Sequence, residues 1–439
     1  MKICLVAMSG VRVRTPELAE LGVTLPQFVN RGKVVASLPS LGLLTVAALT
    51  PDDIDVTYRE VSELDQNEEL EAFDLVGISS YSAQIDEAYA LADRYRALGI
   101  PVVLGGLHVS MMPHEAAKHA DSVVRYGAEE AWPRLIEDFR QGRMKPLYEG
   151  LRSGVFEAPH YVKPRFDLLR GRSYNRITVQ TSRGCPRKCE FCAASIRITS
   201  TFQQKPVDRV VDEIRSAIDV THHPFFELAD DNTFVNKRWG KEFLKAIIPL
   251  EISWFTETDI SIADDDELLD LLAESGCRQI LIGMESPDGD DLVGLDPRDW
   301  KRKHSDQYVQ AIEKIQSRGI TVNGCFILGL ENHTTEVFPR MKEFIDHSGL
   351  LEVQITVLTP FPGTPLYHRM HREGSLLRER YWDRCTLFDV NFQPKNMTVE
   401  ELEEGMRYLF SEVYNEREYT RRKRQYMEIV KQRHGASVM

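Results

Sequence analysis

Three cysteines in one short segment are the residues of this sequence best suited to metal chemistry. Cys185, Cys189 and Cys192 are separated by three and then two residues. Thiolates are soft ligands that suit zinc or an iron–sulfur cluster. A structural zinc site uses four protein ligands, and no further Cys or His stands near this segment. A cluster held by three cysteines keeps one iron open, which the amine and carboxylate of an amino acid could chelate.

The segment resembles the signature loop of the radical S-adenosylmethionine (SAM) superfamily, which follows the first strand of a partial barrel. Residues 177–181 have the apolar pattern of a buried strand leading into the loop, and Phe191 stands before the last cysteine. The resemblance implies that Cys185, Cys189 and Cys192 hold a [4Fe–4S] cluster whose open iron binds SAM. The alternative is a zinc-binding module without catalytic activity.

Length and composition limit the other possibilities. A chain of 439 residues with 42% hydrophobic residues is long enough for two domains. Its formal net charge of −13 argues against nucleic acid as an obligate partner. We expect the four remaining cysteines, Cys4, Cys277, Cys325 and Cys385, to behave as small buried apolar residues. The first residues predict a strand rather than a signal peptide, and thiolate-bound clusters suit a reducing compartment, so we expect a cytoplasmic protein.

Residues 1–145 alternate short apolar strands with amphipathic stretches. The predicted strands are 3–6, 55–58, 75–79, 102–104 and 122–125, and the predicted helices include 41–49 and 86–98. This alternation predicts a doubly wound parallel sheet. Ligands of such sheets bind beyond the carboxyl ends of the strands.

This first half resembles the cobalamin-binding domain that precedes the barrel in many radical SAM enzymes. The resemblance rests on residues 39–44, 105–108 and 127–130 and on the pair Ser79 and Ser80. It implies that Ser79, Ser80, Gly105 and Gly106 lie beside the nucleotide tail of cobalamin. In the family, a His after the first strand ligates cobalt, but residues 8–14 contain no His. We therefore expect cobalamin without a His lower ligand, and the alternative is a domain that has lost the cofactor.

The second half has a different repeat. Residues 146–172 are rich in Pro and Gly and predict a linker. From 173 to 365, strand and helix patterns alternate, which predicts an incomplete (β/α)6 barrel with its chemistry at the C-terminal strand ends. The predicted strands are 177–181, 225–229, 253–257, 280–283, 322–328 and 353–358, and the helices are 206–219, 237–248, 265–275, 304–318 and 335–348. Residues 366–439 form a mixed segment that ends in helices.

Polar or small residues stand at the ends of the predicted barrel strands. They are Asp230, Asp231, Glu257, Glu285, Ser286, Leu328 and Gly329. The resemblance implies that the acidic pair after the second strand faces the SAM amine, and that the Glu–Ser pair after the fourth strand faces the ribose. A carboxylate can accept hydrogen bonds from both ribose hydroxyls, and the Glu after the third strand is a further candidate. The glycine after the fifth strand would let the adenine approach closely.

Together these features predict a radical SAM enzyme that cleaves SAM to a 5′-deoxyadenosyl radical and removes hydrogen from an unactivated carbon. The main expectation is cobalamin-dependent C-methylation of a small-molecule or lipid substrate, with electrons from a donor such as flavodoxin or ferredoxin. Radical cyclisation, carbon–carbon coupling or rearrangement without methyl transfer are the alternatives. The basic run at residues 421–424 usually marks a solvated face, with contact to an anionic membrane surface as a minor alternative.

Overall fold

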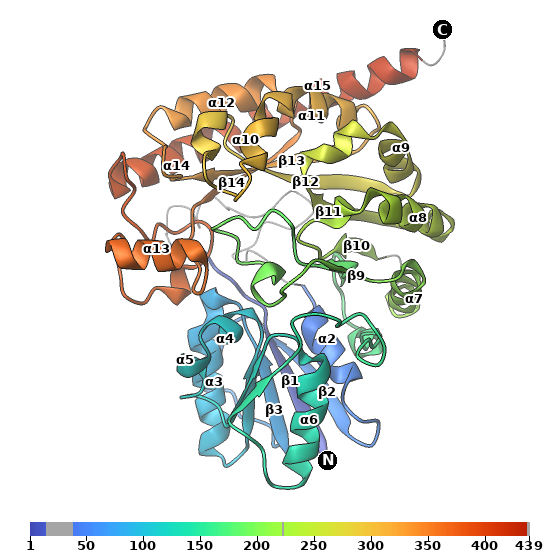
Figure 1. Ribbon diagram of the computed structural model, residues 1–439, viewed down its shortest axis with the longest axis vertical. Helices are drawn as coiled ribbons and strands as arrows, with labels where there is room; N and C mark the ends of the chain where they lie inside the picture. Colours follow the sequence, from blue (N-terminus) through green and yellow to red (C-terminus); the bar gives the residue numbers. More distant parts are fainter. Residues whose placement is uncertain (15–37, 222–223, 437–439) are drawn as a thin grey trace.

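The computed structural model describes residues 1–14, 38–221 and 224–436. It contains two six-stranded parallel sheets, each covered by helices. The first sheet lies in the lower part of the molecule and the second in the upper part, with the green cysteine segment between them (Figure 1). This arrangement confirms the predicted fold class, a doubly wound sheet followed by a partial barrel.

The N-terminal sheet has the strand order β2-β1-β3-β4-β5-β6. Its strands are β1 Lys2–Met8, β2 Asp55–Val61, β3 Leu75–Ser79, β4 Val102–Gly105, β5 Ser122–Arg125 and β6 Leu147–Glu149, and its helices are α2 Leu41–Ala48, α3 Ile85–Ala97, α4 Leu107–Met111, α5 Pro113–Ala116 and α6 Ala128–Arg140. The strand order reverses between β1 and β3. In sheets of this kind, the crevice at that reversal is where ligands bind.

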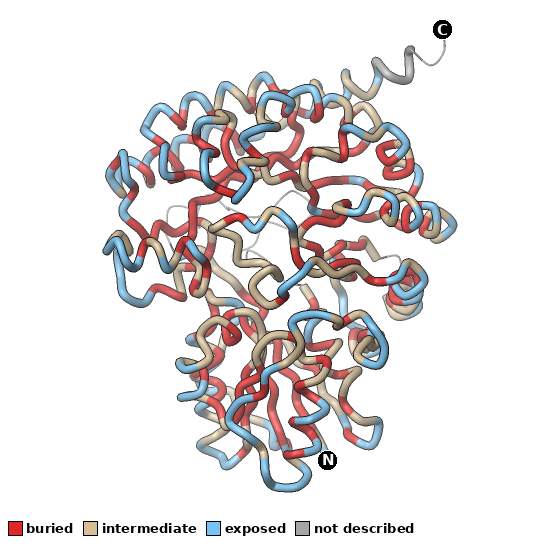
Figure 2. The backbone as a smooth tube through the Cα atoms, in the orientation of Figure 1, coloured by how far each residue is buried: buried red, intermediate tan, exposed pale blue. Residues whose placement is uncertain are grey.

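Strand β1 shows why this sheet is buried on both faces. Ile3 and Leu5 pack with residues of α2 and α6, whereas Cys4 and Val6 pack with residues of α3 on the opposite face. Successive strand residues point to opposite faces, so a continuous apolar run suits a sheet with helices on both sides. Figure 2 shows buried residues along the strands of both sheets and exposed residues on the outer sides of the helices.

The second sheet places its six strands side by side in chain order. They are β7 Ile177–Val179, β10 Phe225–Leu228, β11 Ser253–Thr258, β12 Cys277–Glu285, β13 Thr321–Leu328 and β14 Glu352–Val357. The helices between them are α7 Val207–Ile218, α8 Lys237–Ile247, α9 Asp266–Glu274, α10 Trp300–His304, α11 Tyr308–Gln316 and α12 Val337–His347. In the described chain, β7 and β14 do not pair. The result is the predicted open partial barrel.

The strand β6 and the helices α4, α5 and α6 of the first half are not among the predicted elements. Strand β6 lies inside the predicted linker and pairs in parallel with β5, so the first sheet extends past residue 145. Helix α6 begins directly after Gly127 and lies outside the predicted helices. The cysteine segment is flanked by a short antiparallel pair, β8 Ser182–Arg183 and β9 Gln203–Gln204.

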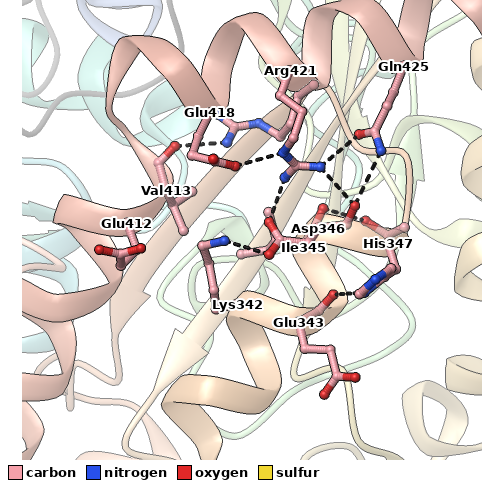
Figure 3. A network of polar contacts seen from close by, with 12 residues as sticks. Lys342, Glu343, Ile345, Asp346, His347, Glu412, Val413, Glu418, Arg421 and Gln425 are labelled. Atoms are coloured by element: carbon pink, nitrogen blue, oxygen red, sulfur yellow. Dashed lines mark hydrogen bonds and ion pairs between the residues drawn. The ribbon is translucent and has the colours of Figure 1, made fainter.

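The C-terminal helices α13 Pro365–Glu373, α14 Val399–Val413 and α15 Glu416–Ala436 continue from the barrel. Arg421 of α15 binds Asp346 of α12 at 2.5 Å and Glu418 at 2.7 Å. Figure 3 shows these residues and their neighbours. Arg422 is buried and donates to the carbonyl oxygens of Leu351 and Val413. Two cations of the basic run therefore join the helix to the barrel. None of the described helices is long and apolar enough to cross a membrane.

Candidate functional site

The C-terminal ends of the barrel strands surround a cavity of about 470 Å³. Cys185, Cys189 and Cys192 all line it, together with acidic side chains from the neighbouring strand ends. The cysteine segment reaches this position because it follows β7, the first strand of the barrel. The structure thus brings the predicted cluster ligands and the predicted SAM site into one cavity.

Asp230 fixes the start of the cysteine segment. Its buried carboxylate accepts hydrogen bonds from the backbone N–H groups of Thr181 and Ser182 at 2.8 Å and from the hydroxyls of Thr181 and Thr233. Four donors satisfy a carboxylate at this depth. Asp230 therefore positions the segment, and Asp231 is the more accessible of the two predicted contacts to the SAM amine.

Two arginines hold the rest of the segment. Arg187 binds Asp259 at 2.7 Å, and its guanidinium lies 3.6 Å from the centre of the Trp300 ring. Arg197 donates to the carbonyl oxygens of Cys192 at 2.6 Å and Cys189 at 2.9 Å. The segment is thus held at its start by Asp230, in its middle by the ion pair of Arg187 with Asp259, and at its end by Arg197.

The three thiols fit a cluster better than a single metal ion. In a [4Fe–4S] cluster each cysteine binds a different iron, so the sulfurs must face one cavity without converging on one point. Among the residues that the structure describes, no three Cys, His, Asp or Glu side chains converge closely enough for one ion. Burial raises the pKa of Cys189 and Cys192 to about 12. Cluster binding must therefore displace protons from both thiols.

Asp231 and Glu257 offer negative charge to a ligand in this cavity. Asp231 accepts hydrogen bonds from the Ser195 hydroxyl at 2.7 Å and backbone N–H at 3.2 Å. Glu257 is accessible from the cavity, but burial within the barrel raises its pKa to about 8, and the nearby Glu227 and Asp231 add to the increase. SAM carries a sulfonium and an ammonium group, and either would stabilise these carboxylates in their charged form.

Glu285, the predicted ribose contact, is held in an unusual conformation at the end of β12. Its φ is 63°, in the left-handed region that glycine favours, and the β12–β13 register is irregular between Gly283 and Glu285. The ammonium group of Lys301 lies 2.7 Å from the Glu285 carboxylate and donates to the Gly283 carbonyl at 2.7 Å. Burial works to lower the pKa of Lys301, but Glu285 and Cys189 raise it above its ordinary value. Lys301 is therefore charged and fixes the Glu285 side chain.

Three predicted SAM contacts do not line the cavity. Ser286 is buried and donates to Asp291 at 2.7 Å. Leu328 is fully buried in the barrel core. Gly329 does have a positive φ of 82°, but a Cβ there would lie 2.9 Å from the Phe392 ring. Its small size thus makes room for the C-terminal segment rather than for a cavity ligand.

A second cavity, of about 300 Å³, lies between the two sheets. The predicted residues Ser79, Gly105 and Gly106 line it at the C-terminal ends of β3 and β4. Barrel residues close the opposite side, among them Gln180, Arg183, Ser195, Ile198 and Ala229. The crevice where the strand order reverses therefore opens toward the barrel.

The backbone of this second cavity suits a ligand that approaches closely. A Cβ on Gly42 would meet no atom within 4 Å, so the α2 backbone borders open space. Gly106 has a φ of 101°, and a Cβ there would lie 2.8 Å from the Ser79 hydroxyl. Ser80 does not line the cavity, and its hydroxyl donates to the Tyr81 carbonyl. These residues fit the polar nucleotide tail of cobalamin, with Ser80 outside the contact.

Several residues at the two cavities are missed by the sequence reasoning. Lys301 lies just before the predicted helix 304–318, and nothing in the sequence links it to Glu285. Cys325 lines the first cavity from β13, although its pattern predicts an ordinary core residue. Arg183 and Glu129 meet across the domain boundary at 3.0 Å. Their separation of more than fifty positions hides the pair from any local pattern.

Comparison with protein families agrees with this geometry. The radical SAM superfamily matches residues 179–345, and the B12 binding domain family matches residues 29–136. A domain of unknown function, DUF4070, matches residues 364–438. These matches cover most of the barrel, most of the first sheet and the C-terminal helices. The cofactors of the chain are accordingly a [4Fe–4S] cluster, SAM and cobalamin.

Two curated relatives and one solved structure extend over most of the chain. Bacteriochlorophyllide d C-12(1)-methyltransferase of Chlorobaculum tepidum is 28% identical over 394 residues, covering 88% of this chain and 84% of that protein. Hopanoid C-2 methylase of Rhodopseudomonas palustris is 26% identical over 369 residues, covering 79% and 67%. The cobalamin-dependent SAM radical enzyme OxsB matches with a TM-score of 0.67 at 13% identity, covering 99% and 71%. With both cofactor domains in this order, the chain belongs to the radical SAM enzymes that carry an N-terminal B12-binding domain.

Proposed function

We propose that this protein is a cobalamin-dependent C-methyltransferase that acts on an unactivated carbon of a small-molecule or lipid substrate. The observation that carries the proposal is the contact between the two cavities. Ala229, at the end of β10, lines both of them. The η3 turn Ser195–Arg197 separates them, with Ser195 in the wall of the second cavity and Ile196 in the wall of the first. A substrate placed at this partition would have access to both cofactors.

The bound cofactors would supply a 5′-deoxyadenosyl radical and a methyl group, and the protein would position both. Asp231 and Glu257 would bind the positive groups of SAM, and Glu285, aimed by Lys301, would accept hydrogen bonds from its ribose. Ser79, Gly105 and Gly106 would hold the tail of cobalamin. Apolar lining residues such as Phe191, Ile327 and Leu358 would keep water away from the reacting carbon.

The relatives support the substrate class. One is named for a tetrapyrrole derivative and the other for a hopanoid, and both names describe methylation. A substrate with a large apolar skeleton would suit the apolar part of the first cavity. The enzyme also needs one-electron reduction of its cluster, for which we propose a flavodoxin or ferredoxin.

An isotope experiment tests the proposal. The reconstituted full-length protein is incubated anaerobically with a reductant, trideuteromethyl-SAM and a small-molecule and lipid extract. We expect formation of both 5′-deoxyadenosine and S-adenosylhomocysteine, and a product that carries the intact trideuteromethyl group. If 5′-deoxyadenosine forms while the product lacks the label, the reaction is a cyclisation, coupling or rearrangement, and the methyltransferase proposal is wrong.

A further inference from the structure

Glu129 and Arg183 form a buried ion pair in which each partner comes from a different domain. Glu129 stands in the first turn of α6, and Arg183 stands in β8, two residues before Cys185. The Arg183 guanidinium donates to the Glu129 carboxylate at 3.0 Å, and the two side chains are 15% and 5% exposed. Both line the cavity between the sheets. Both side chains are therefore largely shielded from solvent, unlike those of the surface ion pairs of the chain.

The pair keeps hydrogen-bonding capacity that the protein does not use. The second carboxylate oxygen of Glu129, Oε2, is buried and has no hydrogen-bond partner. Arg183 directs its remaining contacts to one atom, because Nε and Nη2 both donate to the Gln180 side-chain oxygen, at 3.3 and 3.2 Å. A guanidinium has five N–H donors, so two of them stay free for a ligand. An unpartnered buried carboxylate oxygen is costly unless a ligand satisfies it.

These free groups match a particular part of cobalamin. The corrin rim carries primary amides, each with N–H donors and a carbonyl acceptor, whereas the nucleotide tail carries a negative phosphate. The free Glu129 oxygen can accept from an amide N–H, and the free Arg183 N–H groups can donate to an amide carbonyl. The pair is neutral as a whole, and its carboxylate would repel a phosphate. The chemistry therefore favours a rim amide over the tail.

We propose that Glu129 and Arg183 together bind an amide of the corrin rim, so that the cobalamin site is completed by the barrel. The inference rests on the cobalamin binding of the proposed function and adds two ligand contacts from opposite domains. It also places cobalamin in contact with the residue that leads into the cluster segment. Arg183 connects through Gly184, whose N–H donates to Ser195 at 2.7 Å, to the Ser195–Asp231 hydrogen bond of the first cavity.

The experiment measures corrin affinity in the full-length, iron-loaded protein. Two probes are compared by equilibrium dialysis and absorbance: hydroxocobalamin, and dicyanocobinamide, which keeps the rim amides but lacks the nucleotide tail. Glu129→Gln and Arg183→Met are the test variants. Glu130→Gln is the matched control, because Glu130 is the next residue of the same helix and forms an exposed pair with Arg134. Iron content checks that each variant keeps its cluster.

We expect each test variant to bind both probes about ten- to a hundredfold more weakly, the loss typical of a hydrogen bond to a charged group. The control should bind like the wild type, and the double variant should lose less than the product of the two single losses, because both residues serve one amide. A loss with hydroxocobalamin alone would move the contact to the tail and overturn the amide assignment. Unchanged binding of both probes would reduce the pair to an interdomain ion pair.

Two further outcomes keep the inference separate from the proposed function. Wild-type protein that binds neither probe would refute cobalamin dependence itself, and the inference would fall with it. If Arg183→Met loses iron, Glu129→Gln decides alone, because Glu129 belongs to the other domain. Normal binding by Glu129→Gln with full iron content would overturn the proposal.

Discussion

Replacing Lys301 by Met tests how the barrel orients Glu285, for which we propose contact with the ribose of SAM. Glu285 occupies a left-handed backbone conformation, which costs on the order of 1–3 kcal/mol for a residue other than glycine. Lys301 stabilises that conformation through its 2.7 Å contacts with the Glu285 carboxylate and the Gly283 carbonyl. The two side chains are 10% and 7% exposed. Removing the ammonium group leaves a carboxylate in the barrel without its counter-charge.

The size of the effect follows from that burial. Removing one partner of a buried ion pair costs about 3–5 kcal/mol. The unfolding midpoint in urea should fall accordingly, by this loss divided by the urea dependence of the free energy of unfolding, which increases with the size of the protein. Lys303→Met is the control, because Lys303 is an exposed residue of the same helix. The affinity for SAM, measured by equilibrium dialysis, should fall about ten- to a hundredfold in Lys301→Met, since Glu285 loses its orientation.

A double variant gives the decisive comparison. Replacing both charges, with Lys301→Met and Glu285→Gln together, should restore much of the stability lost in Lys301→Met, because no unpaired charge remains buried. The interaction energy between the two sites should be about 0.5–3 kcal/mol. Additive losses in stability would refute the reasoning, and so would a wild-type midpoint in Lys301→Met. Normal SAM affinity in Lys301→Met would separate Glu285 from the ribose.

The remaining predictions concern the cluster, the second cavity and the charge of the barrel. Replacing any cluster cysteine by Ala should abolish both the cluster and 5′-deoxyadenosine formation. The variant Cys325→Ser should keep about four irons per chain, measured by colorimetric iron assay. Eight irons per chain in the wild type would contradict the prediction of a single cluster. Gly106→Val should abolish retention of hydroxocobalamin after desalting with iron content unchanged, because its φ of 101° and the nearby Ser79 hydroxyl exclude a side chain. Glu257 has a native pKa of about 8 against an ordinary value of 4.5, so its contribution to stability is present at low pH and is lost as pH rises from about 5 to beyond 8. Glu257→Gln should therefore flatten the decrease in Tm of the ligand-free protein over this range, and an unchanged slope would assign the decrease to other groups.

Most of the fold could be predicted because the apolar pattern of each strand indicates which of its faces are buried. Strand β1 is apolar on every residue that the helices cover, and each predicted strand of both sheets is present. Strand β6 is not predicted, because Leu147 and Glu149 are exposed and only Tyr148 is buried. Helix α6 is not predicted either, because Pro133 lies inside it and Gly127 precedes it. Local patterns fail where an element depends on its neighbours for stability.

The site could be predicted only where one segment carries it. The cysteine spacing predicts the cluster ligands from a few residues, and the strand ends predict Asp231, Glu257 and Glu285, all of which line the first cavity. The sequence cannot show that the Asp230 carboxylate accepts hydrogen bonds from the backbone N–H groups of Thr181 and Ser182, because these contacts require strands β7 and β10 to be adjacent. For the same reason Gly329, which meets Phe392, cannot be told apart from a glycine beside adenine.

The chain has no His in the segment where the related family places the histidine that ligates cobalt. The sequence contains no His before His108, so neither the segment after β1 nor residues 15–37, which lie outside the described part of the chain, can supply an imidazole. His108 belongs to the predicted Gly105–His108 motif, but its ring lies 2.9 Å from the Ser82 hydroxyl and packs edge-on against Trp382, and it is not part of the second cavity wall. Burial lowers its pKa to about 4, so it stays neutral and serves the contact with the C-terminal segment. A cobalamin bound here would therefore have no imidazole from His108 or from any earlier residue, and the contacts of the second cavity that could retain it would be made to its rim and tail. This gives the Glu129–Arg183 pair and the Gly106 backbone more weight in binding than they would have beside a cobalt-ligating histidine.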